Sequence, residues 1–127
     1  MNRPMTILIV EDNPANQLLV SAVLEREGYR LELAGSAVEA RQVLARGLPD
    51  LILMDIQLPG MDGLTFTREL KADPASTGVP VVALTALAMS GDRERALAAG
   101  CTGYISKPIN TRTFADEVRA YLRPATV

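Results

Sequence analysis

Short runs of consecutive apolar residues recur along the chain and constrain its fold more than any other feature. The clearest runs are residues 7–10, 51–54 and 81–84, which read ILIV, LILM and VVAL. A strand buried on both faces has such an unbroken run, whereas a strand with one solvent-exposed face alternates apolar and polar residues. Each run precedes a segment of helical periodicity, a pattern typical of right-handed βαβ units. We therefore expect an α/β protein with a parallel sheet.

Two weaker strands, at residues 31–33 and 103–105, complete five strand–helix units. The first helix is expected to start after Asn13, because proline at position 14 suits the first helical turn. Ser36, with glutamate three residues later, predicts the start of the second helix as a capping box. The fourth helix should begin near residue 90 or 91. Glycines are expected to end three of the helices: Gly28, Gly47 and Gly100.

The composition excludes several kinds of chemistry. The chain has no histidine and a single cysteine, Cys101. Histidine-dependent nucleophiles, an internal disulfide and a cysteine-based zinc site are therefore excluded. Carboxylates remain as the main candidate ligands, and they favour hard cations such as Mg²⁺.

Length and charge limit the partners. A chain of 127 residues fits one domain, expected here as residues 1–127 with a core of about 5–123. The net charge is −2 and the basic residues are scattered, which argues against direct binding of nucleic acid. There is no apolar run long enough to span a membrane and no signal-peptide pattern at the start. We therefore expect a cytoplasmic protein.

Polar residues whose side chains can bind ligands or react follow the predicted strands. Glu11 and Asp12 come after the first strand, Asp55 after the third, Thr85 after the fourth and Lys107 after the fifth. Ligands of a parallel sheet bind beyond the carboxyl ends of its strands, so these side chains should converge there. Any single acid could instead only cap a helix or face water, and that alternative stays open for each.

The combination points to phosphoryl chemistry. Three carboxylates at one edge would repel one another unless protons or a cation compensate, and Mg²⁺ fits this role. Lys107 adds a mobile positive charge, and phosphoryl transfer is catalysed mainly by positioning and charge neutralisation. Asp55, central among these groups, could then be a nucleophile that forms an acyl phosphate.

Four segments resemble the motifs of response-regulator receiver domains of two-component signalling, the CheY-like family. They are LIVEDN (8–13), LILMDIQLPGMDG (51–63), VVALTA (81–86) and GYISKP (103–108). They cover nearly the whole chain in the expected order. The resemblance implies a flavodoxin-like (βα)5, doubly wound fold with a five-stranded parallel sheet in the order 2-1-3-4-5. It also implies a receiver without an output domain, similar in style to free-standing single-domain receivers.

The resemblance assigns roles to the acidic residues. Asp55 would be the phosphoacceptor, taking its phosphoryl group from a histidine kinase or a histidine phosphotransfer protein. Asp12 and Asp55 would bind Mg²⁺ directly, Glu11 would help, often through water, and the carbonyl of Gln57 would be a further ligand. The family also implies a phosphoprotein that reacts by self-catalysed phosphotransfer and slow autodephosphorylation rather than as an enzyme with free substrates.

The resemblance also implies a switch. Thr85 would hydrogen-bond the new phosphoryl group, Lys107 would pair with one of its oxygens, and Tyr104 would turn inward behind the threonine. A downstream protein would then read the face made by the fourth helix, fifth strand and fifth helix. Gln57 and Leu87 would tune how fast the phosphate is lost. The peptide bond before Pro108 is expected to be cis, as is typical of the family.

Three alternatives stay open. A Mg²⁺-dependent aspartyl-nucleophile phosphohydrolase would share the site, although such enzymes usually carry a second acid where this chain has Gln57. A constitutive interaction module would have lost phosphorylation, against which the complete set of acids argues. The chain could also be the receiver segment of a hybrid histidine kinase. We expect a monomer or a weak, phosphorylation-dependent dimer.

Overall fold

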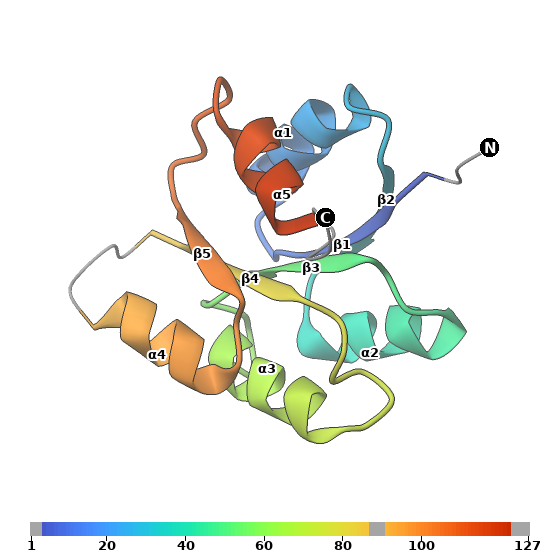
Figure 1. Ribbon diagram of the computed structural model, residues 1–127, viewed down its shortest axis with the longest axis vertical. Helices are drawn as coiled ribbons and strands as arrows, with labels where there is room; N and C mark the ends of the chain where they lie inside the picture. The colour runs from blue at the N-terminus through green and yellow to red at the C-terminus, as the bar shows by residue number, and fades with distance from the viewer. Residues whose placement is uncertain (1–3, 87–90, 123–127) are drawn as a thin grey trace.

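Five parallel strands form a sheet that lies between two layers of helices (Figure 1). The computed structural model describes residues 4–86 and 91–122. The strand order is β2-β1-β3-β4-β5, which confirms the predicted fold and topology. The elements are β1 (Thr6–Val10), α1 (Pro14–Glu25), β2 (Arg30–Ala34), α2 (Ala37–Arg46), β3 (Leu51–Asp55), α3 (Gly63–Ala72), β4 (Val81–Thr85), α4 (Asp92–Ala99), β5 (Gly103–Ser106) and α5 (Phe114–Leu122).

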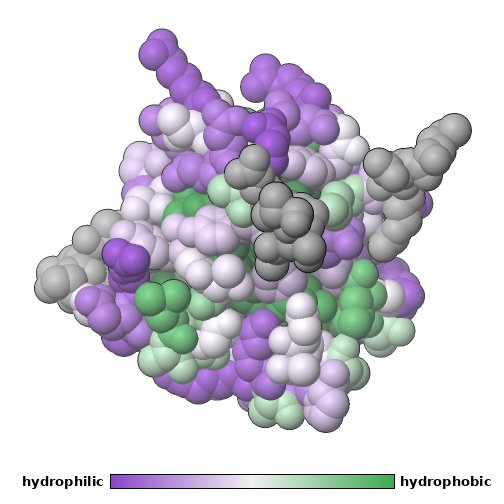
Figure 2. All heavy atoms as spheres, in the orientation of Figure 1, coloured by the Kyte–Doolittle hydropathy of each residue, from purple (hydrophilic) through white to green (hydrophobic). Residues whose placement is uncertain are grey.

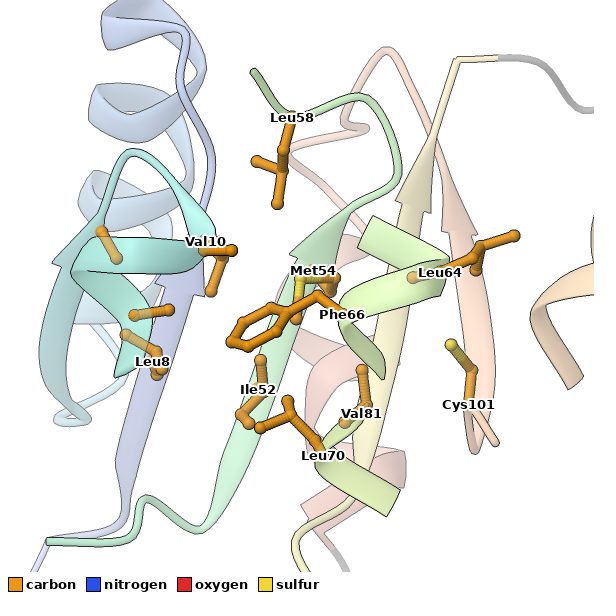
Figure 3. Packing of buried hydrophobic residues seen from close by; sticks show 14 of the residues in the cluster. Leu8, Val10, Ile52, Met54, Leu58, Leu64, Phe66, Leu70, Val81 and Cys101 are labelled. Carbon is orange, nitrogen blue, oxygen red and sulfur yellow. The ribbon is translucent and has the colours of Figure 1, made fainter. Parts of the chain in front are cut away.

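The three predicted apolar runs are the central strands, and they are buried on both faces. In β1, Ile7 and Ile9 belong to the core beneath α1 and α5, whereas Leu8 and Val10 belong to the core beneath α2, α3 and α4. In Figure 3, Phe66 of α3 reaches toward β3 and is fully buried. This two-sided burial explains why the runs contain no polar residue.

Side-chain caps set most helix starts as the sequence indicates. The Asn13 carboxamide accepts hydrogen bonds from the amides of residues 15 and 16, and the Ser36 hydroxyl accepts one from Glu39. Helix α4 begins at Asp92, directly after Gly91. The expected end of the first helix at Gly28 is wrong, because α1 ends at Glu25. Residues 26–28 form tight turns, and the chain reverses at the last of them, Gly28, whose φ is 88°.

The surface in the view of Figure 1 carries apolar residues in separate groups among hydrophilic ones (Figure 2). Within residues 4–86 and 91–122, the helices are all too short or too polar to cross a membrane. Most of the large apolar side chains lie in the two buried clusters on either face of the sheet.

Candidate functional site

Three acidic side chains meet at the carboxyl ends of the two central strands. Parallel pairing puts Val10 of β1 opposite Met54 of β3, so the residues that follow them emerge side by side. Glu11, Asp12 and Asp55 each offer a carboxylate oxygen, and these oxygens all lie within 4.8 Å of one another. Glu11 and Asp55 are buried, whereas Asp12 is exposed.

Lys107 supplies the positive charge of this cluster. Its ammonium nitrogen lies 2.9 Å from Oε1 of Glu11 and 3.1 Å from Oδ2 of Asp55. The backbone places it there, because the Lys107 amide donates to the Thr85 carbonyl at 2.7 Å and so extends the pairing of β5 with β4. The following peptide bond, to Pro108, is cis, as expected.

Backbone groups fix the two buried carboxylates. The Gln57 amide donates to Oδ1 of Asp55 at 3.0 Å, and the Asn13 amide donates to Oε2 of Glu11 at 3.1 Å. Helix α3 starts very close to Asp55, since a Cβ at Gly63 would lie only 2.1 Å from the Asp55 carbonyl oxygen. Glycine is therefore required at position 63 for the loop after β3 to hold this shape.

Burial and charge move the pKa values of the two acids in opposite directions. Burial and the contact with Glu11 raise the pKa of Asp55 to about 6, although Lys107 partly opposes this. Burial would also raise the pKa of Glu11, but its contacts with Lys107, Asp55 and the Asn13 amide outweigh burial and lower it. Burial alone would lower the pKa of Lys107, yet its two acidic partners raise it. The cluster thus resists carrying two negative charges near one ammonium.

The donor set fits a hard divalent cation. The three clustered side chains all offer carboxylate oxygens, which Mg²⁺ prefers. Among the described residues, Oε1 of Glu11 is buried and receives no hydrogen bond of good geometry, although the Lys107 ammonium forms an ion pair with it. A cation beside Glu11, Asp12 and Asp55 would satisfy this oxygen and reduce the repulsion between the acids.

A small polar hollow opens beside the cluster. Its volume is about 270 Å³, at the lower limit of pockets that hold drug-sized ligands. It is lined by Asp55, Ile56, Gln57, Asp62, Thr85, Ala86, Arg95 and Lys107. A hollow of this size and polarity suits a small anionic group better than an extended organic substrate.

Most residues singled out in the sequence meet at this place. Thr85, a buried residue at the end of β4, lines the hollow beside Asp55, as does Gln57. Tyr104 of β5 is half-buried and packs against the core beneath α2, α3 and α4 rather than lining the hollow. Leu87 lies outside the described residues.

Two charged residues that line the hollow, Asp62 and Arg95, were not predicted from the sequence. Asp62 caps helix α3, accepting hydrogen bonds from the amides of residues 64 and 65, and an aspartate before an apolar helix is a recognisable cap signal. Arg95 lies on α4, and nothing in the sequence indicates which face of that helix meets the hollow.

Comparisons with known proteins agree with this geometry. The family model of the response regulator receiver domain matches residues 7–119. The polar-differentiation response regulator DivK of Brucella anthropi is 43% identical over 122 residues, which are 96% of this chain and 99% of that protein. The receiver domain of the sensor histidine kinase PA1611 from Pseudomonas aeruginosa was solved with a magnesium ion in its active-site cleft. It is 39% identical to this chain with a TM-score of 0.85, and the match covers 94% of this chain and 98% of that one. The chemotaxis response regulator CheY4 of Vibrio cholerae has a TM-score of 0.87 and 25% identity, covering 93% and 98%.

Proposed function

The chain belongs to the response regulator receiver domain family of two-component signalling, and we propose that it is a switch controlled by phosphorylation of Asp55. One observation carries the proposal. The buried Asp55 carboxylate borders a small polar hollow while the Lys107 ammonium lies 3.1 Å from it. A nucleophile, a counter-charge and space for an anionic group are thus present together.

The proposed reaction is an in-line transfer from a phosphohistidine. An Asp55 oxygen forms a bond to phosphorus as the phosphorus–nitrogen bond to the donor imidazole breaks, giving an acyl phosphate. Asp55 can act as the nucleophile at neutral pH because its pKa, about 6, leaves the carboxyl group mostly ionised. Lys107 neutralises a phosphoryl oxygen. Bound Mg²⁺, held by Glu11, Asp12, Asp55 and the Gln57 carbonyl, would supply further neutralisation of the phosphoryl oxygens.

The new anion would change the protein through Thr85 and Tyr104. The Thr85 side chain lines the hollow and would donate a hydrogen bond to a phosphoryl oxygen. Tyr104, half-buried on the adjacent strand, would then follow by packing further inward. This would alter the face formed by α4, β5 and α5, where we propose that a downstream protein binds. Such a local charge change acting on a two-state element is a common switching mechanism.

The proposed partners are a histidine kinase or histidine phosphotransfer protein and a downstream protein target. The chain covers 99% of the length of DivK, which supports a free-standing receiver, and the name of that relative suggests a role in polar differentiation. The likeness to a histidine kinase receiver domain favours the hybrid-kinase alternative instead. An immunoblot of the source cells distinguishes the two, because a free-standing receiver gives a band near 13.7 kDa and a hybrid kinase gives a much larger one.

A phosphohydrolase is the rival function. Gln57 occupies the position where such enzymes usually place a general acid, and the hollow is small for an organic phosphate ester. We therefore propose that the chain does not turn over free phosphate esters. Sustained, Asp55-dependent hydrolysis of a chromogenic phosphate ester would favour the enzyme.

Intact-mass measurement tests the proposal most directly. The wild type, Asp55→Asn and the control Asp73→Asn are incubated with acetyl phosphate and Mg²⁺. Asp73 lies beyond the end of α3, away from the cluster, and only caps a turn. We expect the wild type and the control to gain one phosphoryl group and Asp55→Asn to gain none. Equal gain by all three proteins would rule out Asp55 as the phosphoacceptor.

A further inference from the structure

The hollow beside Asp55 has a second basic residue on its wall. Lys107 enters from the end of β5, and Arg95 enters from α4. We propose that Arg95 is a phosphate-binding residue, which contacts the phosphoryl group on Asp55 and thereby couples α4 to phosphorylation. This inference rests on the proposed function and names a contact beyond Thr85 and Lys107.

The charge balance of the hollow and the adjoining acids favours a second basic side chain. Lys107 already pairs with both Glu11 and Asp55, at 2.9 Å and 3.1 Å. Asp62 adds another negative charge to the wall, held in place by hydrogen bonds from Thr65 and the Leu64 amide. A phosphoryl group brings up to about two negative charges into this space. Lys107 and a bound Mg²⁺ together would still not match the charge of the phosphoryl group and the acids Glu11, Asp12 and Asp62, and a guanidinium would reduce this excess of negative charge.

Arg95 has the side chain and the position for this contact. A guanidinium presents five donors in a planar fork that matches phosphate oxygens, and its long stem lets it reach. Arg95 is exposed and already has an interaction partner in this structure, but five donors can serve more than one group. The neighbouring Ala96 is buried in the core, so it fixes the helix on which Arg95 is carried.

Contact with Arg95 would carry the signal into α4. The amide of Arg95 donates to the Gly91 carbonyl at 2.9 Å, so this residue belongs to the first turn of the helix. Gly91 has a φ of 104° and, as a glycine, offers no side chain of its own to cap α4. A phosphoryl group that attracts Arg95 therefore acts on the first turn of the helix.

Binding of beryllofluoride, a stable mimic of the phosphoryl group, tests the contact. Beryllofluoride is titrated into each protein with Mg²⁺ present, and binding is followed by amide NMR signals. The proteins compared are the wild type, Arg95→Gln, Arg95→Lys and Arg93→Gln. Arg93 is the matched control, because it is exposed on the same helix and has the same charge but does not line the hollow. Circular dichroism shows first that each variant is folded.

We expect Arg95→Gln to raise the half-saturating beryllofluoride concentration about 5- to 10-fold, as for loss of a partly exposed charge-assisted hydrogen bond. Arg95→Lys should weaken binding less. Arg93→Gln should stay within about 2-fold of the wild type, since an exposed charge that does not line the hollow is screened by solvent. Hydrogen exchange in α4 should slow on binding in the wild type and not in Arg95→Gln.

The possible failures are distinct. If the wild type binds beryllofluoride and Arg95→Gln matches it, the Arg95 contact is wrong while the proposed function stands. If Arg95→Gln and Arg93→Gln weaken binding equally, the effect is general charge and the contact is again wrong. If the wild type neither binds beryllofluoride nor gains phosphate at Asp55, the proposed function itself fails.

Discussion

The Lys107 ammonium lies 3.1 Å from Oδ2 of Asp55 and also 2.9 Å from Oε1 of Glu11, so one cation holds two buried carboxylates. Two acids that share one counter-charge cannot both be well stabilised as anions. Burial and the contact with Glu11 raise the pKa of Asp55 to about 6, whereas the contacts of Glu11 with Lys107 and Asp55 lower its own pKa despite burial.

Replacing Lys107 with methionine should destabilise the protein when Mg²⁺ is absent. The variant leaves two buried acids without their cation, and breaking a partly buried ion pair of this kind costs about 2 kcal/mol. Urea unfolding at neutral pH measures the change. Arg119→Gln is the control, because its ion pairs with Glu27 and Asp116 are exposed and should contribute little. Equal stability of wild type and Lys107→Met would contradict the proposed role of this ion pair.

The stability of the metal-free protein should fall as pH rises through the titration of Asp55. Its pKa is raised from 3.8 to about 6 on folding, so the folded state binds this proton more tightly than the unfolded state does. The stabilisation is therefore full below about pH 4 and is lost as pH rises through about 6. A shift of this size corresponds to about 3 kcal/mol.

Urea unfolding between about pH 5 and about pH 8 compares the wild type with Asp55→Asn, which lacks this titration. The difference in unfolding free energy between the two proteins should change across this range in favour of Asp55→Asn at the higher pH. The lowered pKa of Glu11 has the opposite effect on stability, which it reduces as pH falls. That effect appears only below the ordinary pKa of 4.5. A constant difference between the two proteins would argue that Asp55 keeps an ordinary pKa.

The sequence predicted the fold and most of the site because both depend on local patterns. Unbroken runs such as residues 51–54 identify buried parallel strands, and such strands bring their carboxyl ends together. Asp55 and Glu11 therefore could be paired from their places after two strands. The short distances to Lys107 follow from the same rule, since β5 also ends at this edge.

Other features could not be predicted because they depend on how elements pack. The end of α1 at Glu25 reflects hydrogen bonds that tighten the last turn, whereas the glycine signal at Gly28 marks only the later reversal of the chain. The position of Arg95 at the hollow could not be predicted, because it depends on how α4 packs against α3 and β5. No spacing of residues within the helix contains that information.

Mg²⁺ should raise the thermal stability of the wild type. A ligand that binds only the folded state at about 100 times its dissociation constant stabilises it by about 2.7 kcal/mol. Neutralising one ligand, in Asp12→Asn or Asp55→Asn, should reduce the rise in Tm produced by Mg²⁺. Differential scanning calorimetry is the suitable method, because the chain has no tryptophan to report binding by fluorescence. Asp116→Asn on α5 controls for net charge and should respond like the wild type, and if the ligand variants did too, the acids would not be the metal site.

Replacing Gly63 with alanine should disturb both stability and phosphorylation. The added Cβ would lie 2.1 Å from the Asp55 carbonyl oxygen and 3.0 Å from the Ile56 Cα, so α3 or the loop after β3 must move. The Gly63 amide also donates to the Ile56 carbonyl at 2.7 Å, a bond that the movement would strain. Overpacking of this kind costs about 2 kcal/mol, more than the gain in helix propensity from alanine.

Gly78→Ala is the matched control for this substitution, because a Cβ there meets nothing within 4 Å and its φ needs no glycine. Urea unfolding should separate the two variants by about 2 kcal/mol. Under conditions where Gly63→Ala remains folded, its rate of phosphorylation by acetyl phosphate should be well below that of Gly78→Ala, since the displaced loop directly follows Asp55 and carries Gln57. If Gly63→Ala loses stability but reacts at the control rate, then the close approach of α3 supports the fold without positioning Asp55.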